Sequence, residues 1–327
     1  MHPPRSAASL LKAALLLFAL NLLLPPSVFA ARCLYVSSYH AGYVWNDDIE
    51  EAMNKVLHGQ CEIKRFYMDG KRNLAPEFAQ KKGLEAKKLI EAWKPDVVIA
   101  ADDNAARYLV MPHLKNSTIP VVFCGINWTV EPYGLPYSNT TGMVEIGPVE
   151  PLAKEVRQVV PNARQGVFLS ADEMTQDKEF ALSQKVYATH GITITQRSVK
   201  TMAEWERAFL EAQKADFIIL GNNAGINDWS HERALAQVTN KNKAKKFTVS
   251  YLEWMAPYTM LTMAKIAGEQ GDWAARAALR ILKGARPDSI PIAANQRWNI
   301  FVNPALLQEA GFTLPAELKE KGVQVGP

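Results

Sequence analysis

The sequence lacks the short motifs that mark most catalytic and nucleotide-binding sites. It contains no G-x-S-x-G, H-E-x-x-H, Walker or G-x-G-x-x-G pattern. Its six histidines show no metal-ligand spacing, and its three cysteines include no C-x-x-C pair. We therefore expect no enzyme, no catalytic residue, no metal site and no cofactor.

Strong net charge and long hydrophobic runs are also scarce. The formal net charge is +4 over 327 residues, which is too small to indicate a nucleic-acid partner. Beyond residue 30 no apolar stretch is long enough to cross a bilayer. These absences favour a small-molecule ligand as the partner, and we expect a monomer.

The N-terminal segment reads as an export signal. Arg5 and Lys12 supply basic charge within and before the apolar stretch 10–24, and small residues precede a cleavage point after about Ala30. The alternative is an uncleaved membrane anchor, but the uninterrupted apolar core 13–20 is short for that role. We predict a periplasmic protein with a cleaved signal peptide.

The scarcity of cysteine leaves one candidate disulfide. An exported protein meets oxidising conditions, in which thiols can pair. Cys33 and Cys61 begin the first two predicted strands, which would be parallel neighbours, whereas Cys124 lies inside an apolar run. A Cys33–Cys61 disulfide and two free thiols remain equal alternatives.

Short apolar runs that end abruptly at small polar residues recur in both halves of the chain. The runs end at Ser37, Asp102 and Asn127 in the first half, and at Ser170, Asn222 and Ser250 in the second. Such runs suit strands buried on both faces of a parallel sheet, and helical stretches separate them. Ligands of open α/β sheets bind at the carboxyl ends of the strands. The pattern predicts an α/β fold of two Rossmann-like lobes whose polar rims face each other across a hinge.

The expected lobe boundaries follow from the points at which the alternation of apolar runs and helical stretches begins again. The predicted segments are a signal peptide at 1–30, a first lobe at 31–147 plus about 256–289, and a second lobe at 148–255 plus about 290–327. The stretch 130–147 is rich in Pro, Gly, Ser and Thr and is expected to be irregular. One or two helices are expected after Glu253, with Asp272 as an N-cap. A chain that crosses between lobes several times would form a multi-segment hinge.

Several segments in this order resemble one known family. They are Lys94–Val98, Ile119–Phe123, Thr141–Met143 with Pro148–Glu150, and Ala278–Gly284 followed by Pro287 and 303–314. The chain resembles the ABC-transporter substrate-binding proteins of the periplasmic-binding-protein-like type I fold, in the group with tryptophan- and tyrosine-binding members. The resemblance implies a ligand held between two lobes and a membrane permease as partner. The turn Asp102-Asp103-Asn104 replaces a short Thr-containing turn of the amino-acid-binding members, which leaves the ligand class open.

Candidate ligand-binding residues of the first lobe follow its strands. They are Ser37, Ser38, Tyr39, Tyr43, Trp45, Asp102, Asp103, Asn104, Asn127 and Trp128. The serines can bind an anionic group or simply satisfy the turn backbone. The aromatic residues can form flat pocket walls, although we expect one of the first three to lie in the core. One aspartate can cap the next helix while the other pairs with a ligand ammonium.

The second lobe offers candidates at the corresponding positions. They are Ser170, Asp172, Thr175, Asn222, Asn223, Glu253 and Trp254. Glu253 is the candidate partner of a cation near the hinge, and its alternative role is a structural ion pair.

Three functions remain in competition at the sequence level. The leading hypothesis is a substrate-binding protein of an ABC-type uptake system that captures a small polar or amino-acid-like organic molecule. The first alternative is a periplasmic sensory partner of a membrane receptor such as a sensor kinase, because the segment Ser37–His40 with Tyr43 and Trp45 resembles a subgroup that includes sensor domains. The second alternative is an exported hydrolytic enzyme that uses the same cleft.

Overall fold

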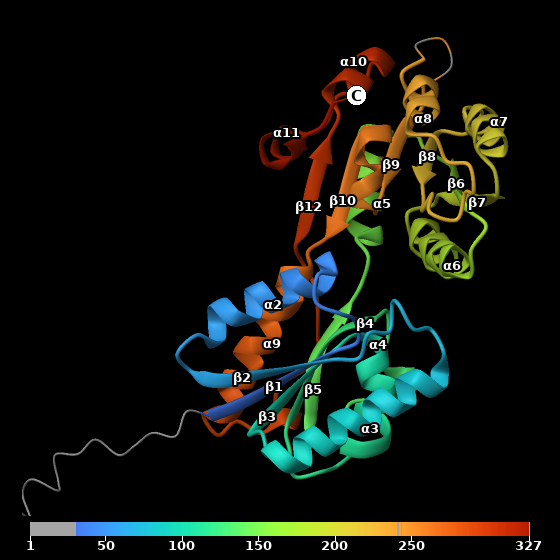
Figure 1. The fold of residues 1–327 in the computed structure, drawn as a ribbon. Coiled ribbons are helices and arrows are strands. Elements are labelled where there is room, and N and C mark those ends of the chain that lie inside the picture. The colour runs from blue at the N-terminus through green and yellow to red at the C-terminus, as the bar shows by residue number, and fades with distance from the viewer. Residues whose placement is uncertain (1–30, 241, 243, 327) are drawn as a thin grey trace, which may run out of the picture.

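The chain folds into two α/β lobes, each built on its own sheet (Figure 1). The structure, a computed structural model, describes residues 31–240, 242 and 244–326. The predicted signal peptide therefore lies outside the described residues. Within those residues, no helix combines the length and the apolar character that a membrane span requires.

The first sheet is parallel throughout and has the strand order β11-β5-β4-β3-β1-β2. Its strands are β1 (Ala31–Ser37), β2 (Cys61–Tyr67), β3 (Val97–Ala101), β4 (Val121–Asn127), β5 (Thr140–Glu145) and β11 (Ala293–Ala294). All five residues of β3 are buried, as its unbroken apolar run predicts for a central strand covered on both faces.

Helices cover both faces of this sheet. They are α2 (Val44–Leu57), α3 (Pro76–Trp93), α4 (Asp102–Ala105), η1 (Ala106–Leu114), η2 (Glu131–Tyr133), α9 (Ala267–Leu282) and η4 (Pro287–Ser289). Ile49 and Met53 of α2 share a buried core with Ala274 and Ala278 of α9. The two helices approach closely at Gly271, where an added Cβ would lie 2.1 Å from the Ile49 carbonyl oxygen.

The second sheet is mixed, with the strand order β13-β12-β10-β9-β8-β6-β7. Its strands are β6 (Gln165–Ala171), β7 (Thr193–Val199), β8 (Phe217–Leu220), β9 (Phe247–Ser250), β10 (Leu261–Lys265), β12 (Trp298–Val302) and β13 (Val323–Gln324). The parallel part runs from β7 to β10, and β12 is antiparallel to β10. The antiparallel β12 is the departure from the expected all-parallel lobe.

The elements around the second sheet bury one continuous core. They are α5 (Val149–Val159), α6 (Met174–Thr189), α7 (Met202–Ala212), α8 (His231–Val238), η3 (Glu253–Tyr258), α10 (Pro304–Ala310) and α11 (Ala316–Lys321). Trp205 of α7 and Tyr187 of α6 are fully enclosed in this core together with Phe217 of β8.

The chain passes between the two sheets three times: from β5 to α5, from β10 to α9, and from β11 to β12. The lobe boundaries expected near residues 256 and 290 differ from the second and third crossings, which lie between Lys265 and Ala267 and between Ala294 and Trp298. Residues 261–265 pair with β9 and β12 of the second sheet, and Ala293–Ala294 pairs with β5 of the first. The one or two helices expected after Glu253 are η3 (Glu253–Tyr258) and α9, and the buried apolar run 261–264 forms strand β10 between them.

Two further expectations are corrected by the local structure. The stretch expected to be irregular contains β5, all six residues of which are buried, so pairing and packing in the sheet override the effect of its glycine. Asp272 is not an N-cap: α9 begins at Ala267, and the Asp272 carboxylate instead pairs with Arg276 one turn later, at 2.8 Å.

A disulfide joins Cys33 of β1 to Cys61 of β2, whereas Cys124 is free and buried. The two strands are parallel neighbours in the sheet. The disulfide lies in the amino-terminal halves of these strands. It is therefore at the opposite edge of the sheet from the polar rim at the carboxyl ends of the strands.

Candidate ligand-binding site

The turn after β1 is held by two buried serines. The Ser38 hydroxyl donates to the Ala101 carbonyl at 2.7 Å and accepts from the Ala105 amide at 2.9 Å. The Ser37 hydroxyl accepts from the Tyr39 amide at 3.0 Å. Both side chains are fully buried, so in this conformation they satisfy backbone groups, which was the alternative interpretation of the sequence.

The three aromatic residues that follow lie on the rim of the first lobe. The Tyr39 and Tyr43 rings meet edge to face with their centroids 5.0 Å apart. Trp45 packs against the core under α2 and α9, and its indole N–H donates to an Asp102 carboxylate oxygen at 3.1 Å. All three side chains remain partly exposed, so none of them is a fully buried core residue.

Asp102 is a buried and strained carboxyl group. Its backbone is in the left-handed region with φ of 69°, and a Cβ added to Gly125 would lie 2.9 Å from its Oδ1 atom. The side chain caps no helix, and its Oδ2 atom has no hydrogen-bond partner among the described residues. Burial and the neighbouring Glu145 carboxylate raise the pKa of Asp102 well above its ordinary value.

Asp103 organises the neighbouring strand end. Its carboxylate accepts from the Asn127 side-chain amide at 2.7 Å and from the Tyr133 hydroxyl at 2.5 Å. The sequence prediction paired Asp103 with Asn127 in one site, and the two residues are in contact. Neither aspartate therefore acts as a helix cap.

Asn104 and Trp128 lie at the two sides of this strand end. The Asn104 amide covers Gly70, where an added Cβ would lie 2.4 Å from its nitrogen. Trp128 has φ of 67°, and its amide donates to the Glu145 carbonyl at 2.9 Å. Its ring extends to Gly147 at the first crossing between the lobes, where an added Cβ would lie 3.7 Å from the ring.

In the second lobe, three predicted residues gather at the ends of β6 and β8. Ser170 is buried beside Gly221, and the Asn222 amide donates to the Gln176 side chain at 2.8 Å. The Asn222 side chain donates to Glu173 at 3.2 Å. Asn223 is partly exposed in the same loop, where its carbonyl accepts from the Ile226 amide.

Four predicted residues of the second lobe are not brought into this group. Asp172 is exposed and pairs with Lys200 at 3.1 Å, and Thr175 is exposed at the start of α6. Glu253 and Trp254 are exposed in η3, which precedes β10 and is not the segment that crosses to the first lobe. The predicted cation partner near the hinge is thus not at a crossing.

The charged groups at the crossings were missed by the sequence reasoning. Glu145 ends β5 and forms an ion pair with Lys265, which ends β10. Glu179 of α6 approaches from the second lobe: an added Cβ on Gly147 would lie 3.4 Å from its carboxylate. Burial raises the pKa of Glu179 to about 7, although Lys265 opposes the shift. The sequence carried a signal for Lys265, because β10 is a mostly apolar run that ends at a charged residue, whereas β5 begins with Thr-Thr-Gly.

A second missed residue is Lys71, in the loop between β2 and α3. Its ammonium lies 4.8 Å from the centroid of the Tyr39 ring and 5.3 Å from that of Tyr43. No periodicity of the sequence marks this loop, because it belongs to neither a strand nor a helix.

The three crossings are tied to one another by hydrogen bonds. The Asn295 side chain accepts from the Ile146 amide at 2.7 Å and donates to the Ile146 carbonyl at 3.0 Å. The Glu269 carboxylate, in the first turn of α9, accepts from the Gln296 and Arg297 amides at 3.0 Å each. These contacts make the crossings one connected unit at the base of the inter-lobe space.

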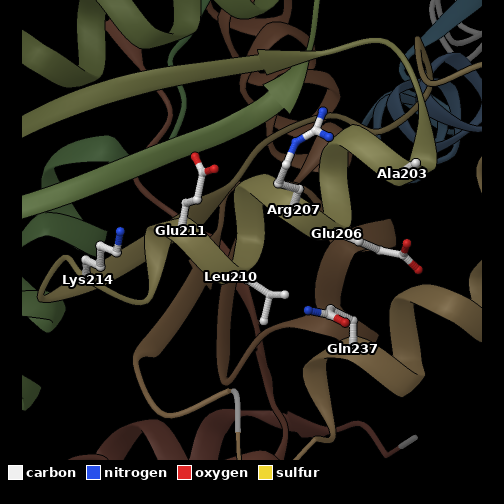
Figure 2. Close-up of a pocket in the computed structure, with 7 residues that line it drawn as sticks. All are labelled: Ala203, Glu206, Arg207, Leu210, Glu211, Lys214 and Gln237. Carbon is white, nitrogen blue, oxygen red and sulfur yellow. The ribbon is translucent and has the colours of Figure 1, made fainter.

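A surface pocket of about 560 Å³ lies elsewhere, between α7 and the end of α8 (Figure 2). It is lined by Ala203, Glu206, Arg207, Leu210, Glu211, Lys214 and Gln237. Because it is formed by helix surfaces and not by strand ends, it is separate from the rim. Within the described residues, no group of His, Cys, Asp and Glu has the arrangement of a metal site.

The arrangement at the rim suits binding of a small organic molecule. It combines aromatic faces, amide groups and opposite charges next to a multi-segment junction between two lobes. Such a mixture of flat apolar walls and a few polar groups is typical of small-molecule pockets.

Solved structures with this fold cover nearly the whole chain. A ligand-free, open substrate-binding protein with adhesive properties from Clostridium difficile aligns with a TM-score of 0.66 at 16% identity, over 90% of this chain and 99% of its own. An ABC domain in complex with L-Trp from Streptococcus pneumoniae aligns with a TM-score of 0.56 at 18% identity, over 90% of this chain and 99% of its own. A conserved domain protein from Vibrio cholerae aligns with a TM-score of 0.59 at 17% identity, over 91% of this chain and 100% of its own.

The family comparison agrees with the fold. A comparison with curated protein sequences finds no match. The family model described as ABC transporter substrate binding protein matches residues 58–325. Because this match spans most of the chain, the protein belongs to the family of ABC transporter substrate-binding proteins, which bind small ligands outside the cytoplasm for membrane permeases and are not enzymes.

Proposed function

We propose that this protein captures a small polar or amino-acid-like organic molecule between its two lobes and delivers it, as a monomer, to the permease of an ABC-type uptake system. Residues 1–30 serve as a cleaved export signal in this proposal. In this proposal the first lobe consists of 31–145 with 267–294 and the second of 149–265 with 298–326, a division that the strand pairing supports.

One observation carries the proposal: side chains from both lobes converge at the first crossing. Trp128 of the first lobe and Glu179 of the second both lie against Gly147. Tyr39, Tyr43 and Asn127 extend the site along the first rim in this proposal, and Asn222, which follows β8, contributes from the second lobe. The ligand favours the closed arrangement because only there can it contact both rims at once.

The test is to identify the bound molecule and then to measure closure. Native mass spectrometry of gently purified protein reports any ligand carried along, and thermal melting screens amino acids, aromatic acids and sugars. A binding compound should decrease the radius of gyration measured by small-angle X-ray scattering. A full screen without any change in melting temperature or radius would contradict the proposal.

Two tryptophan variants locate the site. Replacing Trp128 by Ala should weaken a stacked ligand by roughly 1–3 kcal/mol if its stacking resembles that of nucleic-acid bases on aromatic side chains. Trp254→Ala is the matched control, since this side chain is 56% exposed and lies outside the gathered residues. A loss in the control alone would place the site elsewhere.

Reconstitution separates transport from the sensory alternative. In membrane vesicles that contain the cognate permease and its ATPase, the purified protein should stimulate uptake of the identified molecule. Ligand-dependent activation of a membrane kinase without any uptake would favour sensing.

A further inference from the structure

We propose that the ligand carries a positively charged group, an ammonium or quaternary ammonium, and that this group takes the place on Tyr39 and Tyr43 that the Lys71 ammonium occupies in this structure. The inference rests on the proposed function, which it deepens by naming the ligand's charge.

The first step is the contact between Lys71 and the two tyrosines. Its ammonium lies within 6 Å of both ring centroids, at 4.8 Å and 5.3 Å, and the rings meet edge to face. Aromatic faces at such distances attract cations, and paired rings of this kind recognise ammonium ligands. The pair therefore already works as a cation site, with a side chain of the protein itself as its occupant.

The second step is that this occupant can leave without disturbing the loop. The loop backbone is fixed by amide hydrogen bonds from Met68 to Ser37, from Asp69 to Tyr39 and from Gly70 to Ser38, at 2.9, 3.1 and 2.9 Å. Gly70 lies so close to Ser38 and Asn104 that any Cβ would collide with them. The Lys71 side chain, by contrast, is exposed, so rotation about its own bonds moves the ammonium away.

The third step is the charge around the tyrosine pair. Burial and the negative charges of Asp102, Glu145 and Asp103 raise the pKa of the Tyr39 hydroxyl. Lys71 partly offsets this charge, since it lowers the pKa values of Asp102 and Glu145. Lys265 already forms an ion pair with Glu145. When Lys71 moves out, this lowering of the two pKa values is lost unless another cation takes its place.

A separate observation concerns Asp102, whose charge acts on the Tyr39 hydroxyl. The Oδ2 atom of Asp102 is an acceptor without a partner among the described residues, in a side chain that is 1% exposed. Its other oxygen accepts from Trp45, whose ring lies 5.6 Å from the Lys265 ammonium. Burial disfavours the charged form of this carboxyl group, so a ligand cation placed beside it would favour its ionisation, whereas a ligand carboxylate would oppose it.

The experiment uses tetramethylammonium chloride as the probe, with sodium chloride at equal concentration as the reference. Its binding is measured by saturation-transfer NMR and calorimetry in the wild type, Lys71→Met and Lys115→Met. Lys115→Met is the matched control, because this ammonium lies 5.2 Å from the Tyr137 ring, away from the rim.

Lys71→Met should bind the probe about tenfold more tightly than the wild type, as expected if the internal cation occupies the pair about nine-tenths of the time. Lys115→Met should match the wild type. Adding Tyr39→Leu to Lys71→Met should abolish the gain, with unchanged thermal melting showing that the variant is folded. Equal affinity in all three proteins, or a gain that survives Tyr39→Leu, would overturn the inference.

The ligand itself distinguishes failure of this inference from failure of the proposed function. If native mass spectrometry finds a rim ligand without any positive charge, the cation inference is wrong and the binding function stands. If the probe binds as expected but no compound closes the lobes, the proposed function is wrong and the cation site remains.

Discussion

At the residue scale, Lys265 and Glu145 form an ion pair at the point where two strands leave their sheets. The Glu145 side chain is 6% exposed and that of Lys265 is 26% exposed. Burial raises the pKa of Glu145, although Lys265 opposes the shift. Burial lowers the pKa of Lys265, but Glu145, together with Glu179 and Asp102, outweighs this effect and keeps that pKa above its ordinary value. Each charge is tolerated there because the other is present.

Removing one partner should therefore cost more stability than removing both. We expect Lys265→Met to lower the free energy of unfolding by about 3 kcal/mol, since it leaves a buried carboxylate unpaired. The double variant Lys265→Met with Glu145→Leu should recover much of that loss. Urea unfolding measures the free energy of unfolding of the single and the double variant. The control is Lys55→Met, which removes an exposed pair with Glu51 and should change little. Equal losses for Lys265→Met and Lys55→Met would contradict the expectation.

Glu179 should make stability depend on pH. Its pKa is raised in the folded protein from 4.5 to about 7, so the folded state binds more protons than the unfolded state between these values. The contribution is complete below pH 4.5 and is lost as pH rises through 7. Across this window Glu179 should lower the free energy of unfolding by up to about 3 kcal/mol.

Glu179→Gln tests this dependence, because glutamine does not titrate. The fall in thermal stability between pH 4.5 and 7 should become shallower than in the wild type. Asp177→Asn, an exposed substitution on the same helix, is the control and should keep the wild-type profile. Parallel profiles for Glu179→Gln and the wild type would show that this carboxyl group does not titrate as described.

At the scale of elements, the disulfide between β1 and β2 should stabilise the first lobe without affecting the rim. The bond closes a loop with a sequence separation of 28 residues. Replacing both Cys33 and Cys61 by Ala should lower the free energy of unfolding by about 2–4 kcal/mol in guanidinium denaturation. Ligand affinity should stay unchanged, because the site lies at the opposite ends of the strands. A large loss of affinity in a folded double variant would show that the rim depends on this link.

The elements also show which local patterns the sequence could predict. Strands β1, β4 and β9 end at Ser37, Asn127 and Ser250, where the sequence analysis places the ends of the apolar runs, because the change from apolar to polar residues acts locally. Strand β5 could not be predicted in this way. Gly142 has weak strand preference and the run carries no apolar start, and the pairing with β4 and β11 supplies the missing stabilisation.

At the scale of the whole molecule, the hinge should behave as one connected unit. Asn295 binds both polar backbone groups of Ile146, so it joins the first and third crossings. Asn295→Ala should lower the local opening free energy by about 1 kcal/mol, because a half-buried amide and carbonyl lose their partner. Hydrogen exchange at the Ile146 amide measures this change. Asn299→Ala, an exposed substitution on β12, is the control. Unaltered exchange at Ile146 would mean that this contact does not hold the crossings together.

The sequence by itself determined the two-lobed α/β fold and the strand ends that carry Tyr39, Asp102, Asn127 and Asn222. This was possible because buried parallel strands are continuous apolar runs whose polar ends share one edge of a sheet. Only the tertiary structure decided that Glu145, Glu179, Lys265 and Lys71 join them. These residues meet through strand pairing and chain crossings between segments far apart in sequence, and neither hydrophobic periodicity nor turn chemistry encodes contacts at that distance.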